Sequence, residues 1–220
     1  YMLKLYLLGN SSDHVLRKGY NEMILNVKQS LSYKSAGETF VVNRAHFTEH
    51  LACFFPGLVV LGVTTNASDH AEDDMRFAKQ LLHGCYSLYE KNTVSGLAPD
   101  AMILHDSHMK ITDPKFDLRP ETIESIFYMW RHTGDIRYRD WAWRIFLSID
   151  KHCKSRYGYS GLTSVYTMEK KQSQPSFWMA EVLKYLYLIF DDAQTMALDK
   201  FVLSTEAHPF TIQPWKLYDS

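Results

Sequence analysis

Apolar residues recur at helical spacing along most of the chain, and this pattern restricts the fold to mainly helical architectures. The spacing i, i+3, i+4, i+7 is clear over residues 16–31 and again over residues 69–91. Three more helices are predicted further on. One begins at Pro120, one follows Gly134 and Asp135, and one begins near Ser176.

A further helix is predicted over residues 47–63, and it contains the longest apolar run of the chain. That run, residues 51–63, includes Pro56 and is too short to span a bilayer, so it is expected to be buried in protein. Several helices are apolar nearly all round, which is typical of an inner layer with protein on both sides. Helices of similar length joined by longer loops favour paired helices stacked in a ring or bundle.

Strand signals are few. The stretch ETFVVN, residues 38–43, is the best strand candidate, residues 93–117 are expected to form a loop or short hairpin, and the region 201–212 is expected to be extended. The 220 residues allow one domain or two small ones, but neither a linker nor an internal repeat divides them. The fold class is therefore all-α, with short hairpins in its loops.

The charge balance and the opening of the chain carry separate information. A formal net charge of -1 provides no electrostatic footprint for nucleic acid or for an anionic membrane surface. The opening YMLKLYLLGN has an apolar helical pattern without an N-cap. We therefore expect the chain to be a fragment of a longer polypeptide, the alternative being a trimmed tail.

The three cysteines leave two interpretations open. Cys53, Cys85 and Cys153 are three buried thiols in one interpretation. In the other, a Cys53–Cys85 bridge forms in an oxidising compartment and contributes roughly 3–4 kcal/mol. The sequons at Asn10 and Asn66 favour the secretory route and mark both residues as candidate glycosylation sites.

Carboxylates occur in unusually apolar surroundings. Glu121 and Glu124 lie one helical turn apart directly after Arg119, in LRPETIESIFYMW, where a simple acidic helix start is the alternative. Glu181 lies inside FWMAEVLKYLYLIF and needs a partner or a metal to be buried, with Lys184 as a candidate structural partner. Together with Glu206 and His50, these residues form the acidic, aromatic-lined set that carbohydrate hydrolysis needs.

Four stretches in order along the chain resemble glycoside hydrolase family 47, the class I α-1,2-mannosidases. They are EHLACFFPGLVVLG, LRPETIESIFYMWRHTGDIRYRDWAWRIF, SFWMAEVLKYLYLIFDD and FVLSTEAHPF. The resemblance implies an (α/α)7 barrel and an inverting, Ca²⁺-dependent exo-mannosidase that trims terminal α-1,2-linked mannose from high-mannose N-glycans. It also implies that residues 1–220 are the C-terminal portion of one catalytic domain, in the endoplasmic reticulum or Golgi lumen or secreted.

The resemblance assigns roles to individual residues. Glu121 matches the general base, Thr205 the calcium ligand, and Cys53 and Cys85 a disulfide. The positions expected to line the mannose subsite or hold the waters of the calcium ion are His50, Arg119, Glu124, Phe177, Glu181 and Glu206. The general acid is expected to lie before Tyr1, in an N-terminal segment of the same precursor that would be a partner of this chain, alongside the glycan or glycoprotein.

Two positions depart from the family pattern, and two alternatives to the mannosidase remain, a lectin and an unrelated toroid. Pro175 replaces a common glutamate and Ser204 a common asparagine. The first departure mildly favours a non-catalytic mannosidase-like lectin that recognises N-glycans on misfolded glycoproteins, whereas intact Glu121 and Thr205 favour the enzyme. An unrelated all-α toroid would require a different pattern of acids. Neither nucleic acid nor a membrane is expected as a partner.

Overall fold

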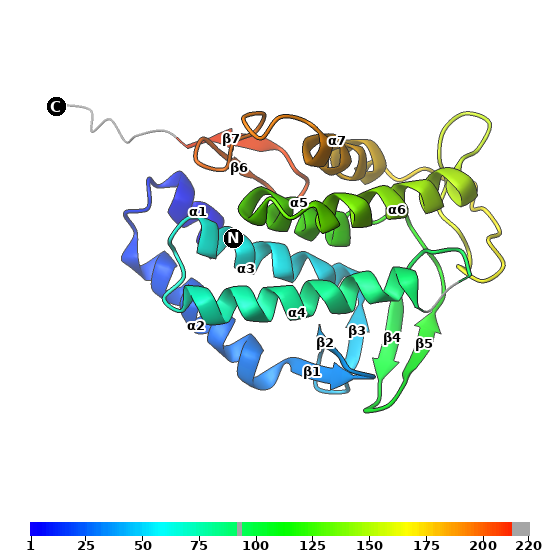
Figure 1. Cartoon of the computed structure of the whole chain (residues 1–220), viewed down its shortest axis with the longest axis horizontal. Helices are drawn as coiled ribbons and strands as arrows, with labels where there is room; N and C mark the ends of the chain where they lie inside the picture. Colours follow the sequence, from blue (N-terminus) through cyan, green and yellow to red (C-terminus); the bar gives the residue numbers. More distant parts are fainter. Residues whose placement is uncertain (92–93, 213–220) are drawn as a thin grey trace.

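The computed structural model describes residues 1–91 and 94–212, and this part of the chain is mainly helical. A 3₁₀ helix, His50–Phe54, precedes α3, and a π-helix, Trp178–Leu183, precedes α7. The α-helices, labelled in Figure 1, are α1 (Met2–Leu8), α2 (His14–Ser30), α3 (Phe55–Thr64), α4 (Ala71–Glu90), α5 (Glu121–Thr133), α6 (Ile136–Cys153) and α7 (Lys184–Phe190).

Helix α5 is the centre of the core. It packs against α3, α6 and α7, and Figure 1 shows it between α3 and α7. All residues in the range 122–129 are buried, including Ser125 and Glu124. This confirms the prediction that some helices form an inner layer with protein on both sides, because only such a position buries a helix all round.

The ends of α5 and α6 follow the local sequence signals. Pro120 precedes the first residue of α5, where its missing N–H leaves no donor unsatisfied. Gly134 ends the helix in the left-handed conformation, with φ 65°. Asp135 then caps α6, since its side chain accepts a hydrogen bond from the Arg137 N–H. The predicted break between the two helices is confirmed.

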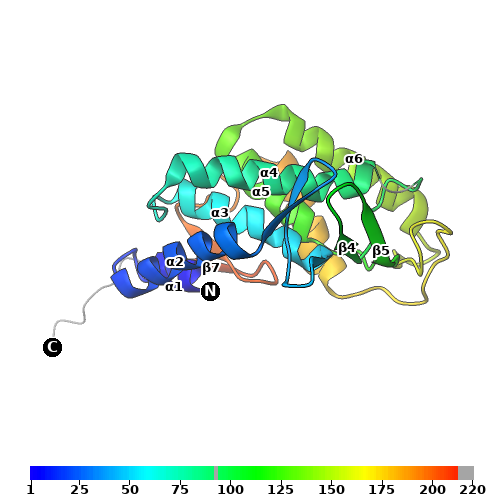
Figure 2. The ribbon, with the colours of Figure 1, turned by 90° about the horizontal axis from the view of Figure 1, so that it is seen from below.

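In the described part of the chain, three small antiparallel sheets connect the helices (Figures 1 and 2). The first pairs β1 (Ser32–Ser35) with β2 (Glu38–Val41), the second contains β3 (Phe47–Glu49), β4 (Ala101–Leu104) and β5 (Met109–Asp113), and the third pairs β6 (Phe201–Leu203) with β7 (Pro209–Thr211). The strand at 38–43, the hairpin within 93–117 and the extended end are confirmed over the described residues. Residue 93 lies outside them.

Strand β1 was not predicted, because its sequence SYKS is polar and only its partner identifies it. Ala36 and Gly37, both with positive φ, form the two-residue turn between β1 and β2. Such turns match the right-handed twist of the strands that they join. The hairpin lies against α4.

The single helix predicted over residues 47–63 is wrong at its start. Phe47–Glu49 is strand β3, paired with β4, and the His50 N–H continues the pairing by donating to the carbonyl oxygen of Asp100 at 2.8 Å. The α-helix begins only at Phe55, one residue before Pro56, whose ring suits the first turn. Apolar spacing could not distinguish these segments, since the partner strand lies some fifty residues further along the chain.

The helix predicted from Ser176 also differs in form. Its first part is a π-helix, Trp178–Leu183, and regular α-helix starts at Lys184. π-Turns are rare and frequently occur at functional sites. Glu181 lies within this segment. Among the residues described, no helix combines the length and apolarity that crossing a membrane would require.

A close contact between α4 and β2 provides a test of the packing. A Cβ atom at Gly84 would lie 2.3 Å from the backbone oxygen of Thr39, which cannot move without displacing β2. We expect Gly84→Ala to lower the free energy of unfolding by about 1–3 kcal/mol. Urea unfolding measures this change.

Gly19→Ala in α2 is the matched control. The new Cβ would meet only the Sδ and Cε atoms of the flexible Met2 side chain. Because alanine is the better helix former, this variant is expected to be neutral or stabilised by up to about 1 kcal/mol. Equal destabilisation of the two variants would contradict the close approach of α4 to β2.

Candidate functional site

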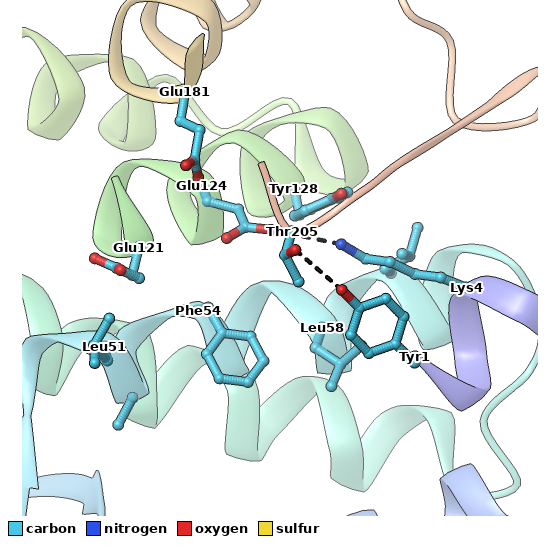
Figure 3. A pocket seen from close by; sticks show the side chains of 12 residues that line it. Tyr1, Lys4, Leu51, Phe54, Leu58, Glu121, Glu124, Tyr128, Glu181 and Thr205 are labelled. Atoms are coloured by element: carbon cyan, nitrogen blue, oxygen red, sulfur yellow. Dashed lines mark hydrogen bonds and ion pairs between the residues drawn. The ribbon is translucent and has the colours of Figure 1, made fainter. Parts of the chain in front are cut away.

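A pocket of about 340 Å³ lies where α1, the 3₁₀ helix, α3, α5, the π-helix and the β6–β7 turn meet (Figure 3). Three carboxylates and one threonine converge on it: Glu121, Glu124, Glu181 and Thr205. The other lining residues are Tyr1, Lys4, Leu51, Ala52, Phe54, Leu58, Leu61 and Tyr128. The acidic start of α5 therefore faces a cavity and is not a solvated helix end.

Two of the pocket carboxylates, Glu124 and Glu181, are held in an environment that disfavours their charge. Burial raises the pKa of Glu124 to about 7, with Lys4 opposing the rise and Glu121 adding to it. Burial also raises the pKa of Glu181 to about 7, and the charges of Glu121 and Glu206 add to this shift. Like charges gathered in a poorly hydrated pocket favour either a proton or a bound cation.

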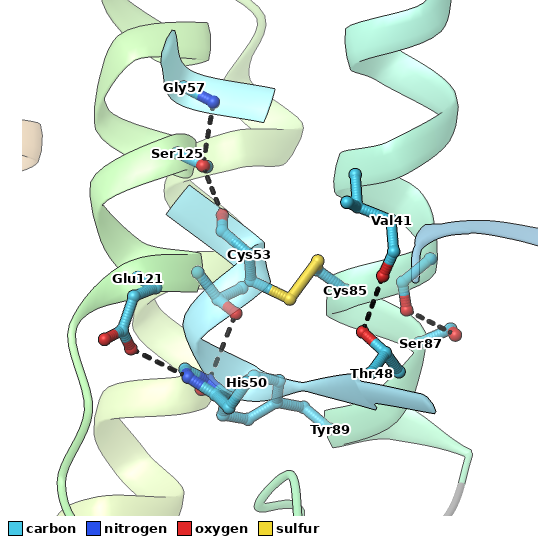
Figure 4. The surroundings of a disulfide bond; sticks show 12 residues. Val41, Thr48, His50, Cys53, Gly57, Cys85, Ser87, Tyr89, Glu121 and Ser125 are labelled. Carbon is cyan, nitrogen blue, oxygen red and sulfur yellow. Dashed lines mark hydrogen bonds and ion pairs between the residues drawn. A yellow bond between two sulfur atoms is a disulfide. The ribbon is translucent and has the colours of Figure 1, made fainter. Parts of the chain in front are cut away.

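His50 contacts Glu121 from behind and does not line the pocket. Its Nδ1 lies 2.9 Å from Oε2 of Glu121, and its Nε2 lies 2.6 Å from the Tyr89 hydroxyl (Figure 4). A carboxylate can only accept, so in the neutral ring Nδ1–H donates to Glu121 and Nε2 accepts from Tyr89. The histidine is almost fully buried, so this chain of hydrogen bonds fixes the orientation of Glu121.

A disulfide bond anchors the segment that carries His50. Cys53 in the 3₁₀ helix is bonded to Cys85 in α4, with their Cα atoms 5.9 Å apart (Figure 4). The Ser125 hydroxyl in α5 also donates to the Cys53 carbonyl oxygen, at 2.5 Å. Cys153 is a buried free thiol. The pairing implied by the family resemblance is therefore present, and the interpretation of three free thiols is wrong.

Loss of this disulfide is expected to be costly. The bond closes a loop with a sequence separation of 32 residues. Removing it should lower the free energy of unfolding by about 3–4 kcal/mol, because the unfolded chain gains freedom. Urea unfolding with and without a phosphine reductant measures the difference. Cys53→Ala/Cys85→Ala should be insensitive to the reductant, and an equally insensitive wild type would contradict the prediction.

Arg119 lies outside the pocket lining, where it is paired with a residue that the sequence did not single out. Its guanidinium donates to the carboxylate of Asp100, which also lies 3.3 Å from Nζ of Lys115. Asp100 is buried, and its backbone oxygen accepts the His50 N–H. Asp100 thus links two of the predicted site residues. No sequence signal marked Asp100, because it lies within the stretch 93–117, which has no apolar period.

Phe177 and Glu206 also lie outside the lining of the pocket. Phe177 is half-buried and directly precedes the π-helix. The Glu206 side chain is 72% exposed and lies 3.4 Å from Nε2 of His208, although its charge contributes to the raised pKa of Glu181. The roles expected for Phe177 and Glu206 stay predictions. The sequon residues Asn10 and Asn66 both lie in exposed turns, and their glycosylation also stays a prediction.

Lys4 is a pocket residue that sequence reasoning missed. Its Nζ lies 4.0 Å from Oε1 of Glu124 and donates to the backbone oxygen of Ser204 at 3.3 Å. The Tyr1 hydroxyl, also from the start of the chain, lies 3.2 Å from Oγ1 of Thr205 (Figure 3). A signal was present, since Lys4 is the single charged residue in the apolar stretch YMLKLYLL.

The two departures from the family pattern have local explanations. The Pro175 carbonyl oxygen accepts the N–H of Trp178, at the start of the π-helix, and Pro175 does not line the pocket. The Ser204 hydroxyl accepts from the backbone N–H groups of Glu206 and His208. A serine can form such a turn in place of asparagine.

The donor set of the pocket suits a hard cation. Thr205 offers a hydroxyl and a carbonyl oxygen, and the three carboxylates lining the same cavity supply negative charge. Within residues 1–91 and 94–212, no three His, Cys, Asp or Glu side chains are grouped closely enough to hold a metal by themselves. An oxygen-preferring ion such as Ca²⁺ would suit these donors, because it accepts hydroxyl and carbonyl oxygens and can complete its coordination with water.

Comparison with known proteins agrees with this geometry. The sequence profile described as glycosyl hydrolase family 47 matches residues 1–212. Mannosyl-oligosaccharide α-1,2-mannosidase IA of Drosophila melanogaster is 36% identical over 99% of this chain and 34% of its own length. Mannosyl-oligosaccharide 1,2-α-mannosidase IB of Homo sapiens is 34% identical over 96% of this chain and 35% of its own length.

A solved structure shares the fold. The α-1,2-mannosidase from Trichoderma reesei superimposes with a TM-score of 0.89 at 27% identity, and the match covers 97% of this chain and 50% of that enzyme. The chain thus spans about a third of the length of these curated relatives and half of the solved enzyme. With a profile match over residues 1–212 and a pocket of converging carboxylates, this chain belongs to glycosyl hydrolase family 47.

Proposed function

We propose that this chain forms part of a calcium-dependent, inverting exo-α-1,2-mannosidase that removes terminal α-1,2-linked mannose from high-mannose N-glycans. The observation that carries the proposal is the convergence of Glu121, Glu124, Glu181 and Thr205 on one pocket. The relatives are named as mannosidases, so the lectin alternative is not favoured. In this proposal the helices form part of an (α/α)7 barrel.

Glu121 acts as the general base. In an inverting glycosidase, a carboxylate takes a proton from the water that attacks the anomeric carbon, opposite the leaving oxygen. The hydrogen bond from His50 orients the Glu121 carboxylate. His50 does not line the pocket, so Glu121 still faces the cavity. None of the described residues is assigned as the general acid. We assign that role to the part of the family domain that this chain does not span.

Thr205 would hold the calcium ion through its hydroxyl and carbonyl oxygens. When bound, the ion would supply coordination sites for water and for sugar hydroxyl groups, and so would help to position the terminal mannose. Glu124 and Glu181 would accept hydrogen bonds from those waters or hydroxyl groups, because ionised carboxylates are acceptors only. Their raised pKa values support this assignment, since a cation would relieve the repulsion among them.

The apolar wall of the pocket supports a sugar substrate. Leu51, Phe54 and Leu58 lie opposite the carboxylates in Figure 3. A hexose has one comparatively apolar face and a rim of hydroxyl groups, so a cavity with one apolar and one acidic wall suits it. The roles of Arg119, Phe177 and Glu206 in binding this substrate belong to the same proposal.

The proposal also includes a place in the secretory pathway. A disulfide bond persists in oxidising compartments, and the exposed sequon residues Asn10 and Asn66 suit glycosylation there. The substrate is then an N-glycan carried by a glycoprotein in the same lumen.

A chimeric enzyme tests the proposed function. Residues 1–212 would replace the matching half of the Trichoderma reesei α-1,2-mannosidase, and mannose release from an α-1,2-linked mannobiose would be measured. We expect release that stops with EDTA and returns with calcium. A folded chimera that releases no mannose, or releases it regardless of EDTA, would contradict the proposal.

A further inference from the structure

Two lysines contact the β6–β7 turn that carries Thr205. This turn, residues 204–207, presents its backbone oxygens to helices on both sides. Nζ of Lys4 in α1 donates to the Ser204 oxygen at 3.3 Å, and Nζ of Lys184 in α7 donates to the Ala207 oxygen at 2.8 Å. The two contacts lie on either side of Thr205 and Glu206, and they join segments that are far apart in the sequence.

From the sequence, Lys184 is a candidate structural partner of Glu181, and in the structure its charge partly opposes the rise in the pKa of Glu181. Among the residues described, the ion pairs do not include that pair, and Lys184 is bonded to the turn. Lys4 is directed to the same turn, although it also lies near Glu124. Its side chain is only 13% exposed. Burying an ammonium group is costly unless it is hydrogen-bonded or paired. The contacts of Lys4 with the Ser204 oxygen and with Glu124 offset this cost.

Hydrogen bonds within the turn define its shape, whereas contacts with other elements define its position. The Ser204 hydroxyl accepts two backbone N–H groups, and Ala207 has a positive φ of 55°. These features set the shape of the turn. They do not set its distance from Glu124 and Glu181, which belong to α5 and the π-helix. Leu203 and Ala207 are buried in the core, and the Tyr1 hydroxyl lies 3.2 Å from Oγ1 of Thr205. The lysine contacts add charged hydrogen-bond donors from α1 and α7 to these links.

We propose that Lys4 and Lys184 are positioning residues that hold the Thr205 turn against the acidic pocket and thereby set its affinity for a divalent cation. The inference rests on the proposed role of Thr205 as a calcium ligand. The two lysines are proposed to act on the position of Thr205 and not through the net charge of the pocket.

Charge and placement predict changes of opposite sign. Removing the ammonium group of Lys4 from the pocket, or that of Lys184 near Glu181, makes the surroundings of the cation more negative, so by charge alone cation binding should become tighter. If the lysines place the turn, their removal should weaken binding, because residues that orient a metal ligand typically contribute about 10–100-fold in affinity. The direction of the change therefore identifies the role.

Lys4→Met and Lys184→Met in the full 220-residue chain provide the test, with Lys18→Met as the matched control. Methionine preserves the length and apolar stem of the side chain. The Lys18 side chain is 79% exposed on α2. Two quantities would be measured in each protein: calcium affinity by titration calorimetry, and backbone amide hydrogen exchange of Glu206, Ala207 and His208. Lys4→Arg, which keeps a charged donor, tests for partial rescue.

We expect each methionine variant to bind calcium about tenfold or more weakly and to exchange the turn amides faster, with the control unchanged. Unchanged or tighter binding together with unchanged exchange would overturn the inference. If the unaltered chain binds no calcium, the proposed calcium site fails. Hydrogen exchange then still decides whether the lysines hold the turn. A failure of Lys4→Met to fold leaves Lys184→Met to decide.

Discussion

Replacing Glu121 by glutamine in the chimeric enzyme is expected to lower the rate of mannose release by about 10²–10⁴-fold, the usual contribution of a general base. Glutamine keeps the size of the side chain and can still accept a hydrogen bond from His50, so the pocket should keep its shape. It cannot take a proton from water. Binding of the disaccharide, measured by calorimetry, should therefore change little.

Glu72→Gln is the control for this experiment. Glu72 lies in the first turn of α4 and is exposed, away from the pocket. Its replacement should leave both turnover and binding unaltered. Retention of most of the activity in Glu121→Gln would exclude Glu121 as the base. Loss of sugar binding without loss of turnover would assign it to substrate recognition.

The second large effect concerns stability and pH. In EDTA, the acidic pocket is expected to make the chain less stable as the pH rises from about 5 to 8. The pKa values of Glu124 and Glu181 are raised from 4.5 to about 7 in the folded protein. Between these values the folded chain binds more protons than the unfolded chain, so its stability falls as the pH increases. For the deeply buried Glu124 this shift corresponds to about 3 kcal/mol, and for Glu181 to less, because solvent screens part of its interactions.

Urea unfolding at several pH values measures this effect. The double variant Glu124→Gln/Glu181→Gln should lose most of the fall in stability with rising pH. Adding calcium to the wild-type chain at pH 8 should raise its free energy of unfolding again. His132 and His152 act in the opposite direction, because burial and neighbouring lysines lower their pKa values. The prediction is therefore tested by the difference in unfolding free energy between the wild type and the double variant at each pH, in which the histidine contributions cancel. Identical pH profiles of the two proteins would refute it.

The sequence predicted the helices better than the junctions between them. Helices α2, α4, α5 and α6 were predicted because each has a continuous apolar face, and hydrophobic burial makes that face periodic. The junction around His50 was not, because β3 exists only through its pairing with β4. Similarly, the π-helix at Trp178–Leu183 follows the same apolar spacing as an α-helix over so short a segment.

The site showed the same division. The carboxylates of the pocket and Thr205 were identified from residue type and from resemblance to a family, and they do converge. The contact of Arg119 with Asp100 was not foreseen, nor was that of Lys4 with the turn of Thr205. Each joins segments whose separation in space no local pattern encodes.

By itself, the sequence determined most of the helices, the presence of an inner helical layer, and which acidic residues stand in apolar surroundings, since these properties follow from side chains and their spacing. Only the tertiary structure decided that Glu121 is hydrogen-bonded to His50, that burial and neighbouring carboxylates raise the pKa values of Glu124 and Glu181, and that two lysines donate to the turn of Thr205. The physical reason is that hydrogen bonding and electrostatic energy depend on distance in space, and distances of a few ångströms between remote segments arise only when the core packs.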